Sequence, residues 1–176
     1  MSKNVVKEKK NENTPGKLRN MATIYLTCGE QVLLLYRQGS KVVNDVWIGS
    51  AGGHFEQCEL NDAYVCVMRE LYEELHITEE MLTDVALRYI TLRRTNGEIR
   101  QNYYFFGELK GGKELELQSN EGKLQWFSFE EAGGLQMPFS AKYAYEHWLE
   151  CGRHNTKMYG GIADGATVVF TELKEF

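Results

Sequence analysis

Residues 52–77 constrain the fold of this chain more than any other segment, because they join a glycine pair, a short loop and a predicted amphipathic helix. Apolar residues at helical spacing mark the side of that helix that we expect to be buried. They are Tyr64, Met68, Leu71 and Leu75. Asn61 stands where an N-cap residue belongs, so the helix is predicted to begin just after it.

Three glutamates lie close together in this predicted helix. At about 3.6 residues per turn, Glu70, Glu73 and Glu74 fall at positions i, i+3 and i+4 and share one face. Each like-charged pair costs a few tenths of a kcal/mol on an isolated helix, so we expect a cation to relieve the repulsion. A hard divalent ion suits carboxylate oxygens, and a glycine pair lets a backbone carbonyl approach such an ion closely. A solvated acidic face is the alternative, but the glycine pair and the capped helix favour a metal and phosphate site.

The segment resembles the Nudix box, a pattern of G, five residues, E, seven residues, and then R-E-U-x-E-E-x-G-U, where U is a bulky aliphatic residue. Gly53 and Glu59 match the first part, and the last part is matched by Arg69, Glu70, Leu71, Glu73, Glu74 and Ile77. Nine residues separate Glu59 from Arg69, which indicates an insertion before the helix, and His76 replaces the glycine of the family. We therefore predict that His76 is a left-handed residue at the helix end and not a catalyst.

The resemblance implies a role for each matching residue. Glu70 and Glu74, one turn apart, would coordinate Mg²⁺ or Mn²⁺, and Glu73 would bind a further ion or hold the attacking water. In the family the carbonyl of the residue before the box glycine also contacts metal, and this role carries over to Gly52. Arg69 is expected to form an ion pair that orients the glutamates, with direct phosphate contact as the alternative.

Residues outside the box complete the predicted site. Glu121 resembles the glutamate of the family that supplies a metal ligand or the general base, and an ordinary turn residue is the alternative. Glu73 is the other candidate for the base, and Glu56 and Glu59 are weaker ones. Substrate contacts are expected from Arg37, Gly53 and Asn102. Aromatic rings on which a base could stack are Trp47, Tyr103, Tyr104, Phe106, Trp126 and Phe139, although most aromatic residues in strands belong to the core.

The resemblance also implies a fold and a reaction. The fold would be of the α/β (α+β) class, an α/β/α sandwich with a mixed sheet between helices. The reaction would be hydrolysis of a nucleoside diphosphate linked to another group, and a triphosphate would give a monophosphate and pyrophosphate. The segment around Met137-Pro138-Phe139 is similar to mutator-type members that act on oxidised purine triphosphates, which makes 8-oxo-dGTP a candidate substrate.

Two alternative functions are weaker. An isomerase on the same fold, like isopentenyl diphosphate isomerase, would need a catalytic cysteine and a histidine-rich metal site, but the four histidines form no cluster in the sequence. A nucleotide-sensing module without turnover would often have lost its helix glutamates, whereas all three are present here. The sequence therefore favours a hydrolase.

Composition bounds the class of partner. The net charge of −5 over 176 residues argues against a nucleic-acid polymer, while a small nucleotide substrate needs no basic surface if a metal supplies the charge. No run approaches the ~20 apolar residues of a membrane span. The N-terminus lacks the apolar core of a secretory signal, so the four cysteines are expected to be reduced thiols of a cytoplasmic protein. Homodimers are common in the family, and the sequence leaves this point open.

Local patterns indicate how the chain is organised. Residues 1–19 are polar and lysine-rich and are predicted to form a flexible arm, or alternatively an edge extension, before one Nudix domain over residues 20–176. Hairpins are predicted to turn at Gly29-Glu30, Asn96-Gly97 and Asp164-Gly165. Residues 42–48 are expected to form a short strand or loop, residues 124–129 a strand and residues 141–150 a helix.

Overall fold

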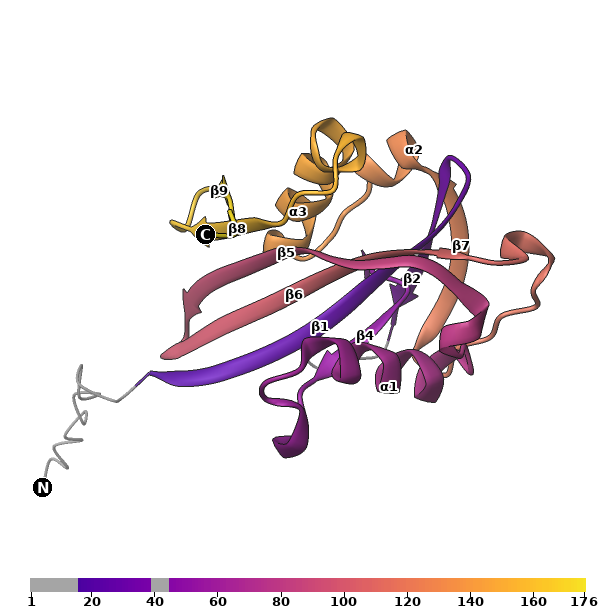
Figure 1. The fold of residues 1–176 in the computed structure, drawn as a ribbon, viewed down its shortest axis with the longest axis horizontal. Coiled ribbons are helices and arrows are strands. Elements are labelled where there is room, and N and C mark those ends of the chain that lie inside the picture. The colour runs from indigo at the N-terminus through magenta and orange to yellow at the C-terminus, as the bar shows by residue number, and fades with distance from the viewer. Residues whose placement is uncertain (1–15, 39–44) are drawn as a thin grey trace, which may run out of the picture.

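The structure is a computed structural model, and it describes residues 16–38 and 45–176. These residues form one mixed sheet with helices on both faces (Figure 1). The strands are β1 (Lys17–Cys28), β2 (Gln31–Arg37), β3 (Val46–Ile48), β4 (Ala51–His54), β5 (Leu82–Thr95), β6 (Glu98–Leu109), β7 (Gly122–Ser128), β8 (Tyr159–Ala163) and β9 (Val168–Glu172). The α-helices are α1 (Ala63–Leu75), α2 (Phe129–Gly133) and α3 (Phe139–Glu150), and short 3₁₀ helices are η1 (Gln57–Glu59), η2 (Glu79–Met81), η3 (Gly112–Glu114) and η4 (Gly152–His154).

Strand β1 lies at the centre of the sheet. One edge of β1 pairs in parallel with β6 along almost its whole length, from Lys17 opposite Glu98 to Thr27 opposite Glu108. The other edge pairs antiparallel with β4 and then with β2. The strand order is β3-β2-β1-β6-β5-β8-β9, and β7 adds to β2. The parallel β1–β6 and β5–β8 pairs make the sheet mixed, which confirms the prediction from the resemblance.

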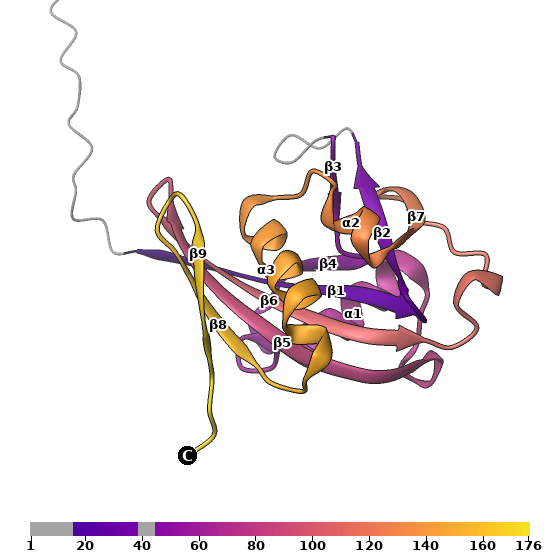
Figure 2. The same ribbon diagram turned by 90° about the horizontal axis from the view of Figure 1, so that it is seen from above.

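Each face of the sheet has its own apolar core. Helix α1 covers one face, and α2 and α3 cover the other (Figures 1 and 2). Neighbouring side chains of a strand point to opposite faces. Ile24 and Leu26 therefore pack on the α1 side, while Tyr25 packs on the α3 side. In the same way, Phe105 packs on the α1 side and Phe106 packs on the α3 side. The result is the predicted α/β/α sandwich.

The three predicted hairpins are present. Strands β1 and β2 join at Gly29-Glu30, β5 and β6 at Asn96-Gly97, and β8 and β9 through a turn that contains Asp164-Gly165. Asn96 and Gly97 have φ values of 51° and 77°, as a two-residue hairpin turn of this type requires. The predicted strand over residues 124–129 and helix over residues 141–150 are β7 and α3, and both begin two residues earlier than predicted.

The start of the domain lies earlier than the predicted boundary. Strand β1 begins at Lys17, so residues 17–19, which were assigned to the flexible arm, belong to the sheet. Their backbone pairs with residues 98–100 of β6, and the low apolar content that suggested an arm does not prevent this pairing. The other arm residues, 1–15, lie outside the described residues. Of the predicted strand or loop over residues 42–48, Val46–Ile48 forms β3, and residues 42–44 also lie outside the described part.

Two predictions from composition concern the cysteines and the membrane. All four cysteines are free: Cys28, Cys58, Cys66 and Cys151. Cys66 is fully buried against the core on the α1 side, as a small packing residue would be. In the described ranges, no helix combines the length and the apolar character that crossing a membrane requires.

Candidate metal and phosphate site

Helix α1 carries the predicted glutamates, and Asp62 caps its first turn. The Oδ1 atom of Asp62 accepts hydrogen bonds from the N–H groups of Tyr64 and Val65, both at 3.1 Å. The prediction that Asn61 is the N-cap is wrong. Asn61 belongs to the preceding turn, which a 2.8 Å hydrogen bond from the Asp62 N–H to the Glu59 carbonyl closes. The helix therefore begins one residue later than predicted.

The packing and the end of α1 agree with the sequence pattern in most respects. The buried side is made by Cys66, Val67, Leu71 and Leu75. Tyr64 and Met68, which were predicted to be buried, are partly buried against the same core. The helix ends at His76, which has φ 55° and ψ 29° and whose N–H donates to the Tyr72 carbonyl at 2.9 Å. This confirms the predicted left-handed helix end.

Arg69 is fully occupied by acceptors of its own chain. Its Nε and Nη2 atoms donate to the two carboxylate oxygens of Glu59 at 2.7 and 3.0 Å. Nη1 donates to Glu70 at 2.9 Å and to Glu73 at 3.0 Å, and Nη2 also donates to the His54 carbonyl at 3.1 Å. A guanidinium has five N–H donors, and these five contacts use them all. Arg69 is thus an ion-pair partner of three carboxylates, with no donor left for a phosphate.

The Glu59–Arg69 pair is buried. The side chain of Glu59 is only 2% exposed, and it also accepts a hydrogen bond from the Glu56 N–H at 2.8 Å. The hydrogen bonds from Arg69 hold the pKa of Glu59 at about 2, well below its usual value, despite the opposing effect of burial. The two-residue insertion therefore does not displace Glu59 from the site, and the residue anchors η1 to α1.

Glu74 lies against the glycine pair. The Gly52 N–H donates to Glu74 Oε2 at 3.2 Å. Burial is the main reason that the pKa of Glu74 is raised to about 7; the nearby charge of Glu70 also raises it, whereas the hydrogen bond from Gly52 lowers it. Gly52 has φ 156°, and a Cβ atom there would lie 2.4 Å from the Ala22 carbonyl oxygen, so only glycine fits between α1 and β1.

Glu70 lies equally close to Gly53. A Cβ atom on Gly53 would lie 2.2 Å from Glu70 Oε1, so the glycine gives the carboxylate its place. Burial raises the pKa of Glu70, although Arg69 opposes the rise. Glu70 and Glu74 are therefore two partly desolvated carboxylates at the same glycine pair, and both are more costly to ionise than in water.

The chemistry of this pair fits a hard divalent ion. Mg²⁺ is commonly held by one or two carboxylates and completes its shell with substrate phosphates and water. Glu73 shares the Nη1 atom of Arg69 with Glu70, but its side chain is 56% exposed, whereas that of Glu70 is 13% exposed. Among residues 16–38 and 45–176, no group of three or more His, Cys, Asp or Glu side chains is arranged to hold an ion. The same holds for the histidines, so the histidine-rich centre of an isomerase is not found in the described residues either.

Two further predicted residues meet beside Glu74. Arg37 at the end of β2 lies opposite Gly122 at the start of β7, and this register brings Glu121 next to it. Arg37 Nη2 donates to Glu121 Oε2 at 2.8 Å. The charge of Glu121 raises the pKa of Glu74 and that of Arg37 lowers it, so both lie close to the carboxylate pair. The sheet thus gathers Gly52, Arg37, Glu74 and Glu121 from four separate segments.

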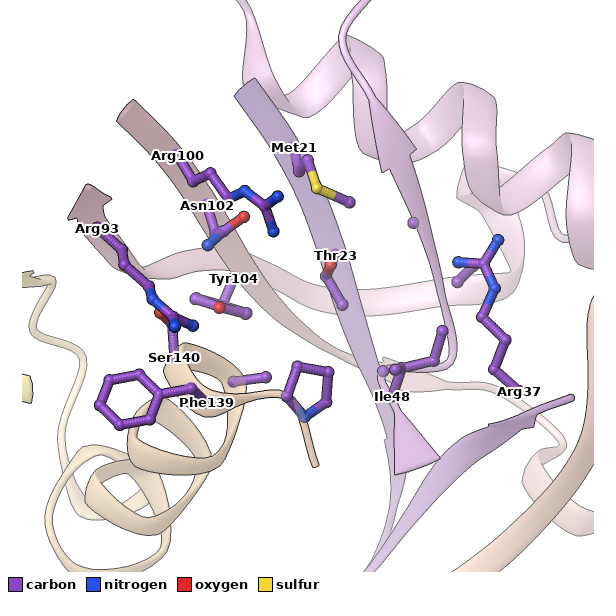
Figure 3. Close-up of a pocket in the computed structure, with 15 residues that line it drawn as sticks. Met21, Thr23, Arg37, Ile48, Arg93, Arg100, Asn102, Tyr104, Phe139 and Ser140 are labelled. Atoms are coloured by element: carbon purple, nitrogen blue, oxygen red, sulfur yellow. The ribbon is translucent and has the colours of Figure 1, made fainter. Parts of the chain in front are cut away.

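A cavity of about 150 Å³ opens beside this carboxylate pair (Figure 3). Gly52 and Arg37 line one end, and Asn102 lines the other, whereas Gly53 does not line it. Of the aromatic residues predicted to stack on a base, Tyr104 and Phe139 line the cavity. Trp47, Tyr103, Phe106 and Trp126 pack in or against the two cores instead.

Four polar residues of the cavity, Thr23, Arg93, Arg100 and Ser140, were not predicted from the sequence. Arg93 of β5 lies opposite Arg100 of β6, and the Asn96-Gly97 turn that sets this pairing was visible in the sequence. Counting outward from that turn would have placed both arginines on one face of the hairpin. Ser140 reaches the cavity from the first turn of α3, and no local pattern indicates that contact.

Comparisons with known proteins are consistent with this arrangement. A family model described as the NUDIX domain matches residues 17–149. A search of curated proteins found no match. Among solved structures, a MutT protein from Bacillus halodurans is 23% identical with a TM-score of 0.59, over 88% of this chain and 97% of that one. The dihydroneopterin triphosphate pyrophosphohydrolase of E. coli is 20% identical with a TM-score of 0.58, over 78% and 99%. A C. elegans Ap4A hydrolase is 17% identical with a TM-score of 0.56, over 79% and 99%. At these identities the structures show a shared fold.

Proposed function

Because this chain belongs to the Nudix family of pyrophosphohydrolases, we propose that it hydrolyses the diphosphate linkage of a nucleoside diphosphate derivative with Mg²⁺ or Mn²⁺. The observation that supports this most directly is the pair of partly buried carboxylates, Glu70 and Glu74, packed against Gly52 and Gly53. A divalent ion there would compensate both charges. The first candidate substrate is 8-oxo-dGTP, which the similarity of the carboxyl half to mutator-type proteins suggests.

Glu70 and Glu74 would hold the ion, and the carbonyl of Gly52 would complete the protein ligands. When bound, the metal would neutralise diphosphate oxygens and stabilise the charge that develops at phosphorus. Arg69 would act as a positioning residue, since its ion pair with Glu59 fixes α1 relative to the loop before it and its ion pair with Glu70 orients that carboxylate. The carboxylates are thus oriented before a substrate arrives.

Glu121 is our first choice for the general base. Its Oε2 atom is fixed by Arg37, while Oε1 has no hydrogen-bond partner among the described residues. Oε1 would accept the proton of the attacking water as the new P–O bond forms and the bridging P–O bond breaks. Glu73 is the second choice, because one of its oxygens is engaged by Arg69 and the side chain is half exposed.

A nucleotide panel with Glu74→Gln tests this proposal. Phosphate and pyrophosphate release would be measured from dGTP, 8-oxo-dGTP, ADP-ribose and dinucleoside polyphosphates, with and without Mg²⁺. We expect metal-dependent release for the wild type, and a loss of about a hundredfold or more in the variant, because one metal ligand is gone. Glu116→Gln, which removes an exposed carboxylate far along the chain, is the matched control.

Two outcomes would contradict the proposal. If Glu74→Gln unfolds the protein and the activity loss only follows the unfolded fraction, the carboxylate has a structural role. If the folded wild type binds Mg²⁺ and nucleotide but releases nothing from any compound of the panel, the chain is a nucleotide-sensing module. Circular dichroism and calorimetric binding measured on the same samples separate the two.

A further inference from the structure

We infer that the end of the cavity opposite Arg37 binds a second anionic group of the substrate, a phosphate or a carboxylate (Figure 3). This end, called here the arginine pocket, is formed by Arg93, Arg100, Asn102 and Ser140 (Figure 3). The link to the substrate rests on the proposed function. Gly52 lines the same cavity and bonds to Glu74, so a substrate with its diphosphate at the carboxylate pair would extend into the pocket.

The positions of the two arginines of the pocket destabilise the pairing of β5 with β6. Arg93 of β5 and Arg100 of β6 are direct partners in the antiparallel register, so their side chains leave the sheet on the same face. Like charges directly opposite each other destabilise a strand pair. An anion between or above the guanidinium groups would turn this repulsion into attraction, and arginine is well suited to bind phosphate or carboxylate.

The protein itself neutralises only part of this charge. Glu98 is shared by Arg100 at 3.5 Å and Arg19 at 3.7 Å. Arg93 has no carboxylate within 4.0 Å among the described residues, and its guanidinium lies 4.8 Å from the ring centre of Phe139. The Glu98 contact of Arg100 is made by its buried Nε atom, which forms no hydrogen bond in the described part of the chain. The 15 lining residues of the whole cavity include three arginines and neither aspartate nor glutamate, so positive charge is in excess.

Helix α3 adds neutral donors to the same place. It begins after Pro138 without a side-chain cap, and its first residues, Phe139, Ser140 and Ala141, line the cavity. The first N–H groups of a helix have no partner within the helix and favour negative charge. The Ser140 side chain lies in the cavity wall, and only 5% of the residue is exposed. Arginines, helix N–H groups and a buried hydroxyl converge on one small volume.

The amide signals of α3 provide a test that does not require hydrolysis. Inorganic phosphate and malonate would be titrated separately into ¹⁵N-labelled full-length protein, without metal and at constant ionic strength. We expect saturable shifts of the Ser140 and Ala141 amides with at least one of the two anions. The anion that binds more tightly, inorganic phosphate or malonate, identifies the group as a phosphate or a carboxylate. Without metal, the acidic pair of α1 repels either anion and does not compete.

Variants decide whether the pocket binds the anion. Arg93→Gln should raise Kd about tenfold or more, as expected for losing a charge-assisted hydrogen bond, and Ser140→Ala should raise it less. Arg94→Gln is the matched control, because Arg94 is the next residue of β5, is exposed and points to the other face. Equal affinity in Arg93→Gln and the wild type, or no saturable shift with either anion, would overturn the inference. A chain that hydrolyses nucleotides but fails this test would keep its proposed function and lose only the anion pocket.

Discussion

Arg69 has an ion pair with each of three glutamates, and the one with Glu59 is the most buried. A buried carboxylate without its partner charge costs several kcal/mol, so Glu59 and Arg69 depend on each other. Glu59 also joins η1 to α1, across the segment that carries the insertion. At the scale of single residues, the stability of the site is therefore concentrated in a pair that does not face the substrate cavity.

We predict that Glu59→Gln lowers the free energy of unfolding by about 3 kcal/mol at pH 7. The pKa of Glu59 is lowered to about 2 in the folded protein, so its contribution is present above the unfolded value near 4.5 and is lost as the pH falls toward 2. Urea unfolding at pH 7 and pH 3 measures this. The difference in unfolding free energy between variant and wild type should be smaller at pH 3 than at pH 7. Glu116→Gln, an exposed control, should change neither value. A gap that is equal at both pH values would contradict the ion-pair account.

At the scale of elements, the position of α1 depends on its cap. Asp62 accepts two backbone N–H hydrogen bonds, whereas Asn61 makes no such contact in the described structure. We predict that Asp62→Ala costs about 1 kcal/mol of unfolding free energy, and that Asn61→Ala costs a few tenths at most. Chemical denaturation of the two neighbouring variants measures the difference. The reverse order of stabilities would restore Asn61 as the cap.

The same scale shows what could be predicted from the sequence. The Asn96-Gly97 hairpin and α1 were predictable because turn chemistry and helical spacing are local signals. The N-cap residue of α1 could not be predicted, because Asn61 and Asp62 are both good cap residues and the preceding turn decides between them. Glu70 and Glu74 were predictable since their spacing is within one helix. The side of the cavity formed by α3 was not predictable, because Phe139 meets Arg93 through packing between segments that are distant in the sequence.

At the scale of the whole molecule, metal binding should be linked to stability and pH. Glu74 has its pKa raised to about 7, so without metal the unfolding free energy should fall as pH rises from about 4.5 through 7. Mg²⁺ needs the ionised carboxylate and stabilises only the folded state, by about 2.7 kcal/mol at a hundred times its Kd. We predict that MgCl₂ raises Tm more at pH 8 than at pH 6.

Calorimetric scans at both pH values, with EDTA as the metal-free reference, measure this effect. Glu74→Gln should show little Mg²⁺-dependent rise in Tm at either pH, because the ligand carboxylate is absent. It should also remove the decline in stability between pH 4.5 and 7 that Glu74 causes in the metal-free protein. If Mg²⁺ raised the Tm of the wild type by the same amount at pH 6 and pH 8, metal binding would not depend on the ionisation of Glu74.

The central strand of the sheet has a consequence for how the protein is made. Among the described strands, β1 leaves the ribosome first, yet its longest partner is β6, with Lys17 opposite Glu98, 81 positions later. At about 5–20 residues per second, β1 waits roughly four to sixteen seconds for that partner. Until β6 is made, the apolar Ile24–Tyr25–Leu26 run can pair with β2 and β4 and pack against α1, but the edge of β1 that faces β6 has no partner strand. Slow translation over residues 55–97 would prolong the time for which this edge of β1 has no partner strand.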